Sequence, residues 1–94
     1  MPHDAHLIKK IRAAVKSRNV FISSHAAKRM RQRKISTSMV FEAMLKGTTD
    51  REPEPDMRHG AMKVELHRYS AGVHYCVVVA VFDDELMVSV VTVY

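Results

Sequence analysis

The sequence is poor in cysteine, glycine and long apolar runs, and each shortage excludes a class of protein or site. The single cysteine, Cys76, cannot form an internal disulfide, and it begins an apolar run typical of a buried strand. That run, residues 76–82, is the longest and has seven residues, whereas a membrane-spanning helix needs about 20. No apolar N-terminal stretch resembles a signal peptide. We therefore expect a soluble, cytoplasmic protein without a membrane partner.

Motifs for cofactors and metals are also missing. The three glycines form no glycine-rich phosphate loop, and no Ser-His-Asp arrangement can be recognised. His59, His67 and His74 lack the spacing of metal ligands, and one cysteine adds little to them. The sequence therefore predicts no cofactor and no metal site.

The chain has 94 residues, of which 47% are hydrophobic. This length and composition indicate one globular domain. Residues 1–19 are predicted to form a basic N-terminal helix, and residues 20–47 a helical motif region. Residues 48–60 are predicted to form a loop, and residues 61–94 a β-meander.

Three helices are predicted in the first half, over residues 4–17, over residues 24–34, and from residue 36 to a stop at residue 47. Between the first two, residues 20–22 are expected to form a short extended connector. The predicted caps are Asp4, Ser23 or Ser24, and Ser36, and the predicted left-handed stop is Gly47.

Strands are predicted in the second half. Apolar and polar residues alternate from Met62, residues 73–82 form a long β-branched run, and residues 85–94 follow a tight turn at Asp83-Asp84. A short edge strand is expected near the start of the 48–60 loop. The fold class is therefore α+β, with two to three N-terminal helices packed on a curled sheet of three to four mostly antiparallel strands.

Charge is divided unevenly along the chain. Residues 1–34 carry ten Lys and Arg against one acid, whereas residues 35–94 carry five cations against nine acids. A basic half on a small domain is typical of a protein with a polyanion partner, most often a nucleic acid. A solvated, cation-rich helical face has the same composition. The acids of residues 50–56 either cover the basic charge, contact a partner or form a plain solvated loop.

The stretch SSHAAKRMRQRKIS, residues 23–36, concentrates the basic charge on one predicted helix. On an α-helix, positions 25, 29 and 33 advance by only about 40° each, so His25, Arg29 and Arg33 form one row. Guanidinium groups match phosphate oxygens, and a neutral imidazole beside them suits a general base. The alternative for His25 is a capping or surface residue. Three further cations point elsewhere and are expected to contact an RNA backbone or only solvent: Lys28, Arg31 and Lys34.

The last predicted strand ends in a polar residue pair. Strict alternation places Leu86, Val88, Val90, Thr92 and Tyr94 on one face, and Val93 on the other. Because Thr92 and Tyr94 continue the apolar face of this strand, we expect the core to give way to a polar cleft at the end of the strand. Tyr94 would there stack on a base or move a proton, and otherwise it covers the edge of the core.

The segments HAAKRMRQRKIS, FEAMLKG and VVTVY resemble a family of short bacterial proteins of unknown function, over roughly residues 21–94. The family pattern is His-Ala-x-x-Arg-Met-x-x-Arg-x-Ile-Ser. Such proteins are similar in organisation to RelE/ParE-like and colicin/barnase-like ribonuclease toxins. The resemblance implies N-terminal helices before a curled sheet, and a small zinc-finger or helix-turn-helix antitoxin as partner. It points to His25, Arg29 and Arg33, and to Thr92 and Tyr94.

These observations lead to the hypothesis of a metal-independent endoribonuclease that is the toxin of a toxin–antitoxin pair. In this hypothesis His25 transfers a proton, Arg29 and Arg33 hold the phosphate, and Tyr94 stacks on a base or makes the second proton transfer. The alternative is a non-enzymatic module that binds nucleic acid or protein, including a ParE-like protein that poisons gyrase. The other residues expected to bind RNA are Lys28, Arg31, Lys34 and Thr92.

Overall fold

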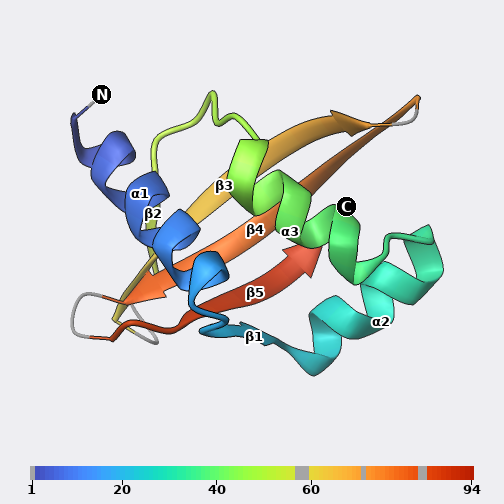
Figure 1. Ribbon diagram of the computed structural model, residues 1–94, viewed down its shortest axis with the longest axis horizontal. Helices are drawn as coiled ribbons and strands as arrows, with labels where there is room; N and C mark the ends of the chain where they lie inside the picture. The colour runs from blue at the N-terminus through green and yellow to red at the C-terminus, as the bar shows by residue number, and fades with distance from the viewer. Residues whose placement is uncertain (1, 57–59, 71, 83–84) are drawn as a thin grey trace.

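Helices fill the first half of the chain and strands most of the second half (Figure 1). The computed structural model describes residues 2–56, 60–70, 72–82 and 85–94, with the backbone alone for residues 2–4. The elements within these residues are α1 (Pro2–Lys16), β1 (Val20–Ile22), α2 (Ser24–Arg33), α3 (Thr37–Lys46), β2 (Glu54–Asp56), β3 (Ala61–Ser70), β4 (Val73–Phe82) and β5 (Val88–Val93).

The strands form one mixed sheet in the order β1-β5-β4-β3-β2. Strands β2 to β5 pair antiparallel, whereas β1 runs parallel to β5, with Val20 opposite Val88. The prediction of an α+β fold is confirmed. The predicted three to four strands and the connector at residues 20–22 were wrong, because this segment forms an edge strand. Its partner lies about seventy residues away in the chain, so no local pattern in the sequence marks it.

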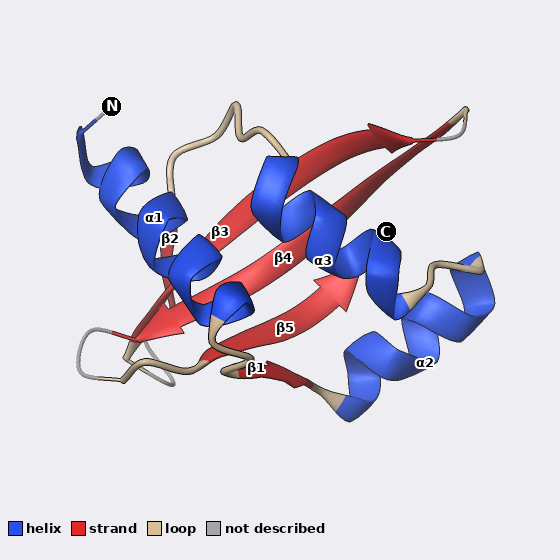
Figure 2. Cartoon of the chain, viewed as in Figure 1, coloured by secondary structure: helices blue, strands red, loops and turns tan. Residues whose placement is uncertain are grey.

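The helices pack on one face of the sheet. Helices α1 and α3 lie across this face, and α2 lies beside the end of β5 (Figure 2). One apolar core joins them, and it includes Ile11 of α1, Met30 of α2, Met44 of α3 and Val79 of β4. Within the described residues, no helix combines the length and the apolar character needed to cross a bilayer.

Two of the three predicted helix caps are present. The hydroxyl oxygen of Ser23 accepts a hydrogen bond from the backbone N–H of Ala26, and that of Ser36 accepts one from Met39. Both oxygens satisfy N–H groups that a helix start leaves without partners. The third prediction was wrong, because α1 begins at Pro2 and includes Asp4. Proline suits the first turn of a helix, since its φ is already helical and its missing N–H is not needed there.

Gly47 ends α3 as predicted, but not in the left-handed conformation. Its φ is −67° and its ψ is 162°, which is extended backbone. A Cβ atom at this position would lie 2.3 Å from the carbonyl oxygen of Ala43 and 3.0 Å from that of His67. Glycine is therefore needed here because a side chain would clash with the last turn of α3 and also meet the backbone of β3, and not because of a left-handed φ.

Strand β3 follows the alternation predicted from Met62, and β4 is largely buried, as expected of the β-branched run at residues 73–82. Val64 and Leu66 are buried under the helices, and they alternate with Lys63, Glu65 and His67, which point to the opposite face. The edge strand of the 48–60 loop is β2, in the middle of the loop, whereas near the predicted start of the loop only an isolated antiparallel bridge joins Thr48 to His67. The turns expected at Asp83-Asp84 and around Ala71 fall at residues outside the described ranges.

Strand β5 contains an irregularity that the strict alternation did not predict. Val79 pairs with Val90, whereas the adjacent Val78 pairs with Thr92, so Val91 is an extra residue on β5. An extra residue on one strand is a β-bulge, and it shifts the alternation of all later residues by one position.

The bulge changes which residues of β5 face the core. Val93 is fully buried in the core with Val88 and Val90, although alternation predicted that it faces the other way. Thr92 and Tyr94 consequently leave the predicted face and lie on the side of the sheet opposite the helices. Strand β5 also begins at Val88 rather than at the predicted residue 85.

Candidate functional site

Helix α2 lies along the edge of β5 at the point where β1 ends. The backbone N–H of Ser23 donates to the carbonyl oxygen of Val90 at 3.1 Å, and the Ser23 hydroxyl donates to that of Val91 at 3.1 Å. Farther along the helix, Nε of Arg29 donates to the carbonyl oxygen of Val93 at 3.4 Å. These bonds satisfy strand carbonyls that lack a neighbouring strand. Arg29 therefore has a structural contact that the sequence did not predict.

The row of His25, Arg29 and Arg33 meets the end of β5 at its middle residue, because Arg29 contacts the Val93 carbonyl. His25 and Arg33 are exposed, whereas Arg29 is half-buried. The helix keeps this position by burying Ala26 and Met30. The other three predicted RNA-binding cations of the segment are exposed: Lys28, Arg31 and Lys34.

The sheet face opposite the helices is called the open face here, and it carries Lys63, Glu65 and His67 of β3 together with Thr92 and Tyr94. A hollow of about 230 Å³ lies on it, lined among others by Arg51, Lys63, Glu65 and Thr92. A second hollow of about 220 Å³ is lined by Phe21, Phe82 and others. The two hollows share Val91, the extra residue of the bulge. The open face is thus a concave surface with polar and aromatic parts.

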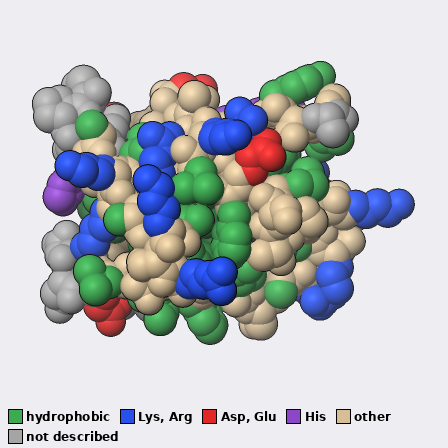
Figure 3. All heavy atoms as spheres, in the orientation of Figure 1, with side chains coloured by type: hydrophobic (Ala, Val, Ile, Leu, Met, Phe, Trp, Pro, Cys, Tyr) green, Lys and Arg blue, Asp and Glu red, His purple; other side chains and the backbone are tan. Residues whose placement is uncertain are grey.

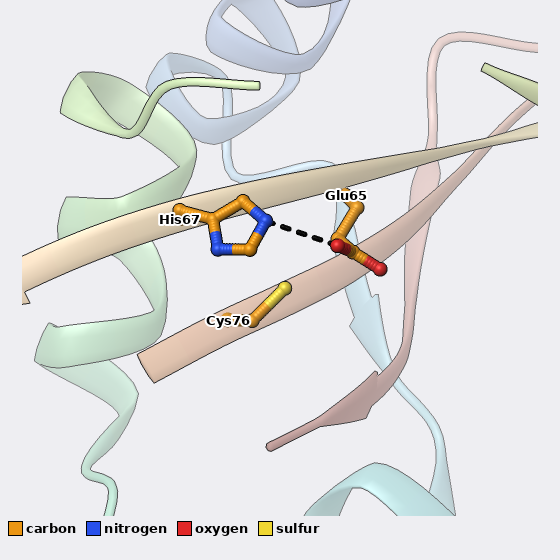
Figure 4. Close-up of side chains that lie close together, drawn as sticks. All are labelled: Glu65, His67 and Cys76. Carbon is orange, nitrogen blue, oxygen red and sulfur yellow. Dashed lines mark hydrogen bonds and ion pairs between the residues drawn. The ribbon is translucent and has the colours of Figure 1, made fainter. Parts of the chain in front are cut away.

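Glu65 is the centre of a hydrogen-bonded group on the open face. One of its oxygens lies 2.9 Å from Nε2 of His67 (Figure 4). The other oxygen accepts a hydrogen bond from the hydroxyl of Tyr94 and lies 3.7 Å from a terminal nitrogen of Arg51. The ring of His67 stacks on that of His74, with 3.2 Å between Nδ1 and Nε2. This group therefore contains a carboxylate that can accept a proton, an imidazole and a phenol that can donate one, and a guanidinium that can bind a negative charge.

The protonation states within this group follow from its contacts. The hydrogen bond from Tyr94 holds the pKa of Glu65 below its ordinary value of 4.5, and the same bond raises the pKa of the Tyr94 hydroxyl. Burial raises the pKa of the Cys76 thiol to about 12, and the nearby charge of Glu65 adds to this rise. At neutral pH Glu65 is therefore a carboxylate, Tyr94 a phenol and Cys76 a thiol with little nucleophilic character.

A family model described as a domain of unknown function (DUF4258) matches residues 22–94. The chain belongs to the DUF4258 family. This match confirms the expected membership of a family of unknown function, over nearly the expected residues. No curated protein and no solved structure matches the chain.

The DUF4258 region contains α2, α3, most of the sheet and the open-face residues named above except Phe21, whereas α1 precedes it. A wide hollow of about 740 Å³ lies where α1 meets the end of α3, and it is lined among others by Lys9, Arg12, Lys16 and Thr48. Arg12 reaches across this boundary and donates a hydrogen bond to the carbonyl oxygen of Gly47 at 3.4 Å. Lys and Arg side chains are spread over this side of the molecule (Figure 3).

The sequence analysis selected Thr92 and Tyr94 as candidate site residues, although it placed them on the other face of the strand. It did not select Glu65, His67 and Cys76. A signal for them exists, because residues 65 and 67 alternate onto one face of β3. The antiparallel register of β3 with β4 sets Cys76 opposite His67. Applying this register to the predicted hairpin would have brought the three side chains together.

Proposed function

We propose that this protein is a metal-independent endoribonuclease that holds single-stranded RNA against the open face, beside α2. The observation that carries the proposal is the hydrogen-bonded set of Tyr94, Glu65 and His67. Thr92 lines a hollow on the same face. Thr92 and Tyr94, which belong to the VVTVY segment, thus lie near Glu65 and His67, which belong to none of the three segments that carry the family resemblance.

RNA supplies its own nucleophile, the 2′-hydroxyl, so a small site is sufficient for cleavage. The Glu65 carboxylate would accept the 2′-hydroxyl proton, and the protonated form of His67 would donate a proton to the leaving 5′-oxygen. The bond from phosphorus to the 2′-oxygen forms as the bond to the 5′-oxygen breaks, which leaves a 2′,3′-cyclic phosphate and a 5′-hydroxyl. Arg51 and Lys63 line the same hollow as Glu65, and they would stabilise the negative charge of the phosphorane.

Helix α2 offers a second candidate base and further cations. His25 is exposed in the first turn of α2, where the sequence hypothesis assigned proton transfer to it. Arg33 is exposed on the same row. Arg29 uses only Nε in its bond to Val93, so its terminal nitrogens can still meet a phosphate oxygen. Glu65 and His25 are therefore rival candidates for the base, and separate variants distinguish them.

The toxin assignment rests on the resemblance to RelE/ParE-like proteins. Three N-terminal helices on one face of a sheet, with no described helix on the other face, fit the organisation that this resemblance implies. We propose a small antitoxin protein as the partner that suppresses cleavage. Expression of the chain alone should then stop growth of a bacterial host, and co-expression of the neighbouring gene should restore it. Normal growth with detectable soluble protein would contradict the toxin role.

Cleavage of labelled RNA in the presence of EDTA tests the catalytic proposal. We expect Glu65→Gln to lower the cleavage rate by about 10²–10⁴-fold, because a positioned acid or base contributes that much. His25→Ala tests the rival base, and His6→Ala is its matched control, since His6 is also an exposed histidine on a helix. Glu85→Gln is the matched control for Glu65→Gln. If both Glu65→Gln and His25→Ala cleave at the wild-type rate, both assignments are wrong.

A non-enzymatic RNA-binding module is the second candidate, and the hollow beside α1 favours it. Lys9, Arg12 and Lys16 line this hollow together with the hydroxyl groups of Thr48 and Thr49. Such a surface suits phosphate groups, and among its described lining residues there is no histidine and no carboxylate. RNA that is bound and stays intact through the EDTA experiment would support this candidate over the ribonuclease.

A further inference from the structure

The open face gathers three different metal-ligand types from two neighbouring strands. Glu65 and His67 lie two residues apart on β3, and Cys76 of β4 is the cross-strand neighbour of His67. One ligand atom from each of the three side chains lies within 4.8 Å of those of the other two. Figure 4 shows the three side chains pointing toward a common point. A carboxylate oxygen, an imidazole nitrogen and a sulfur atom therefore converge.

We propose that Glu65, His67 and Cys76 bind one thiophilic divalent metal ion, of which Zn²⁺ is the representative. Magnesium and calcium prefer oxygen ligands only, whereas zinc accepts sulfur, nitrogen and oxygen together. A tetrahedral zinc ion holds its ligand atoms roughly 3.3–3.6 Å apart. Small side-chain rotations would bring the three ligand atoms from their observed spacing of up to 4.8 Å to this distance. The paired strands keep the backbone fixed.

The surroundings of His67 orient it for a metal. Its Nδ1 lies 3.2 Å from Nε2 of His74, which leaves Nε2 on the side of Glu65, where the three ligand atoms meet. A histidine ligand typically uses its second nitrogen in this way, in a hydrogen bond that fixes the ring. The carboxylate of Asp50 lies 3.6 Å from the same Nε2 and adds negative charge near the site.

The three proposed ligands are buried enough to shield a metal ion from water, and an ion can still reach them from solvent. Cys76 is 1% exposed, so its sulfur is shielded from water, whereas the side chains of His67 and Glu65 are 25% and 17% exposed. Glu65 also lines the open hollow of about 230 Å³, which offers a path for an ion. Three protein ligands leave a fourth position for water or another ligand, and the Tyr94 hydroxyl is bonded to one of the proposed ligands, Glu65. A site with an open position exchanges ligands with solvent.

Metal binding does not depend on ribonuclease activity, and it is measured on the protein alone. The metal-binding proposal can therefore fail while the ribonuclease proposal holds, and the ribonuclease proposal can fail while the metal-binding proposal holds. The metal-binding test is also specific, because Cys76 is the single cysteine of the chain. Any metal–thiolate signal must then come from Cys76.

The test is titration of the purified, reduced chain with Co²⁺, which reports thiolate ligation by near-ultraviolet absorption, followed by displacement with Zn²⁺ in calorimetry. We expect one ion per chain and a thiolate band that Cys76→Ser abolishes. His74→Ala should lower the metal affinity by about 10–100-fold, because it removes the hydrogen bond that orients His67. His67→Ala should lower the metal affinity further, because it removes a ligand. His6→Ala should bind like the wild type. A folded wild-type chain without a thiolate band, or with an affinity that Cys76→Ser and His67→Ala leave unchanged, would overturn the proposal.

Discussion

The hydroxyl of Tyr94 donates a hydrogen bond to the carboxylate of Glu65, and this bond connects the end of β5 to the middle of β3 across β4. Tyr94 reaches this position because Val91 forms a bulge and reverses the faces of the last residues. A strand without the bulge would point the Tyr94 ring to the helices. The bulge therefore builds the group that we propose to be catalytic.

Tyr94→Phe should lower the free energy of unfolding by about 0.5–1.5 kcal/mol, the usual net contribution of one hydrogen bond. The ring and its packing stay, so the fold should not change. Urea denaturation of the two proteins measures the difference. A stability equal to that of the wild type would show that this bond contributes nothing in solution.

Arg29→Ala and Arg33→Ala should separate a structural arginine from a purely RNA-binding one. Arg29 bonds to the Val93 carbonyl and is half-buried, so its loss should cost about 0.5–1.5 kcal/mol of stability. Arg33 is exposed, so its loss should change stability by less than about 0.5 kcal/mol. Both variants should weaken RNA binding, as measured by fluorescence anisotropy. Equal stability of the two variants would contradict the structural role of Arg29.

Gly47→Ala should destabilise the fold by about 1–3 kcal/mol, because the added methyl group meets the Ala43 carbonyl at 2.3 Å. Gly72→Asn is a suitable control, since Gly72 has a φ of 78° with open space around it, and asparagine tolerates this region. Thermal unfolding of both variants measures the contrast. If Gly72→Asn lowers the stability more than Gly47→Ala does, the steric explanation of Gly47 is wrong.

The stability of the fold should fall at acidic pH partly through Glu42. Nε of Arg68 donates to its carboxylate at 2.8 Å, and this bond lowers the pKa of Glu42 from its ordinary 4.5. The folded-state pKa lies below the unfolded one, so the pair stabilises the fold above about pH 4.5, and this contribution is lost as the pH falls through the lowered pKa. Urea denaturation at several pH values should show a weaker decline for Glu42→Gln. An identical decline would exclude Glu42 as a contributor.

Zinc should inhibit cleavage if the two proposals both hold, because the ion would take the Glu65 oxygen and the His67 nitrogen that move protons. Saturating Zn²⁺ should stop cleavage by the wild type, and EDTA should restore it. Cys76→Ser should cleave RNA but resist zinc at the same concentration. Equal inhibition of wild type and Cys76→Ser would place the inhibitory ion elsewhere.

The sequence predicted those parts of the fold that depend on local patterns. Helices α2 and α3 and their serine caps follow from periodicity and capping, and the hairpin of β3 and β4 follows from alternation and a turn. Strand β1 was missed because its three residues pair with a strand at the other end of the chain. The bulge was missed because Val90, Val91 and Val93 are all valines, and side-chain type alone does not show which one is extra.

The candidate site divides in the same way. The row on α2 follows from helical spacing within one segment, so the sequence was sufficient to predict it. The group around Glu65 depends on the register of β3 with β4 and on the bulge in β5, which are relations between strands. Arg29 shows the limit most clearly, because its contact with Val93 depends on where α2 packs and not on its own helix.

The most direct test of the central claim compares a single-stranded RNA with the same sequence made of DNA, each incubated with the wild-type chain in EDTA. The proposed chemistry uses the 2′-hydroxyl as nucleophile, so the RNA should be cut to products with 2′,3′-cyclic phosphate ends while the DNA stays intact. RNA that is bound and not cut, or products with 3′-hydroxyl ends, would contradict the claim.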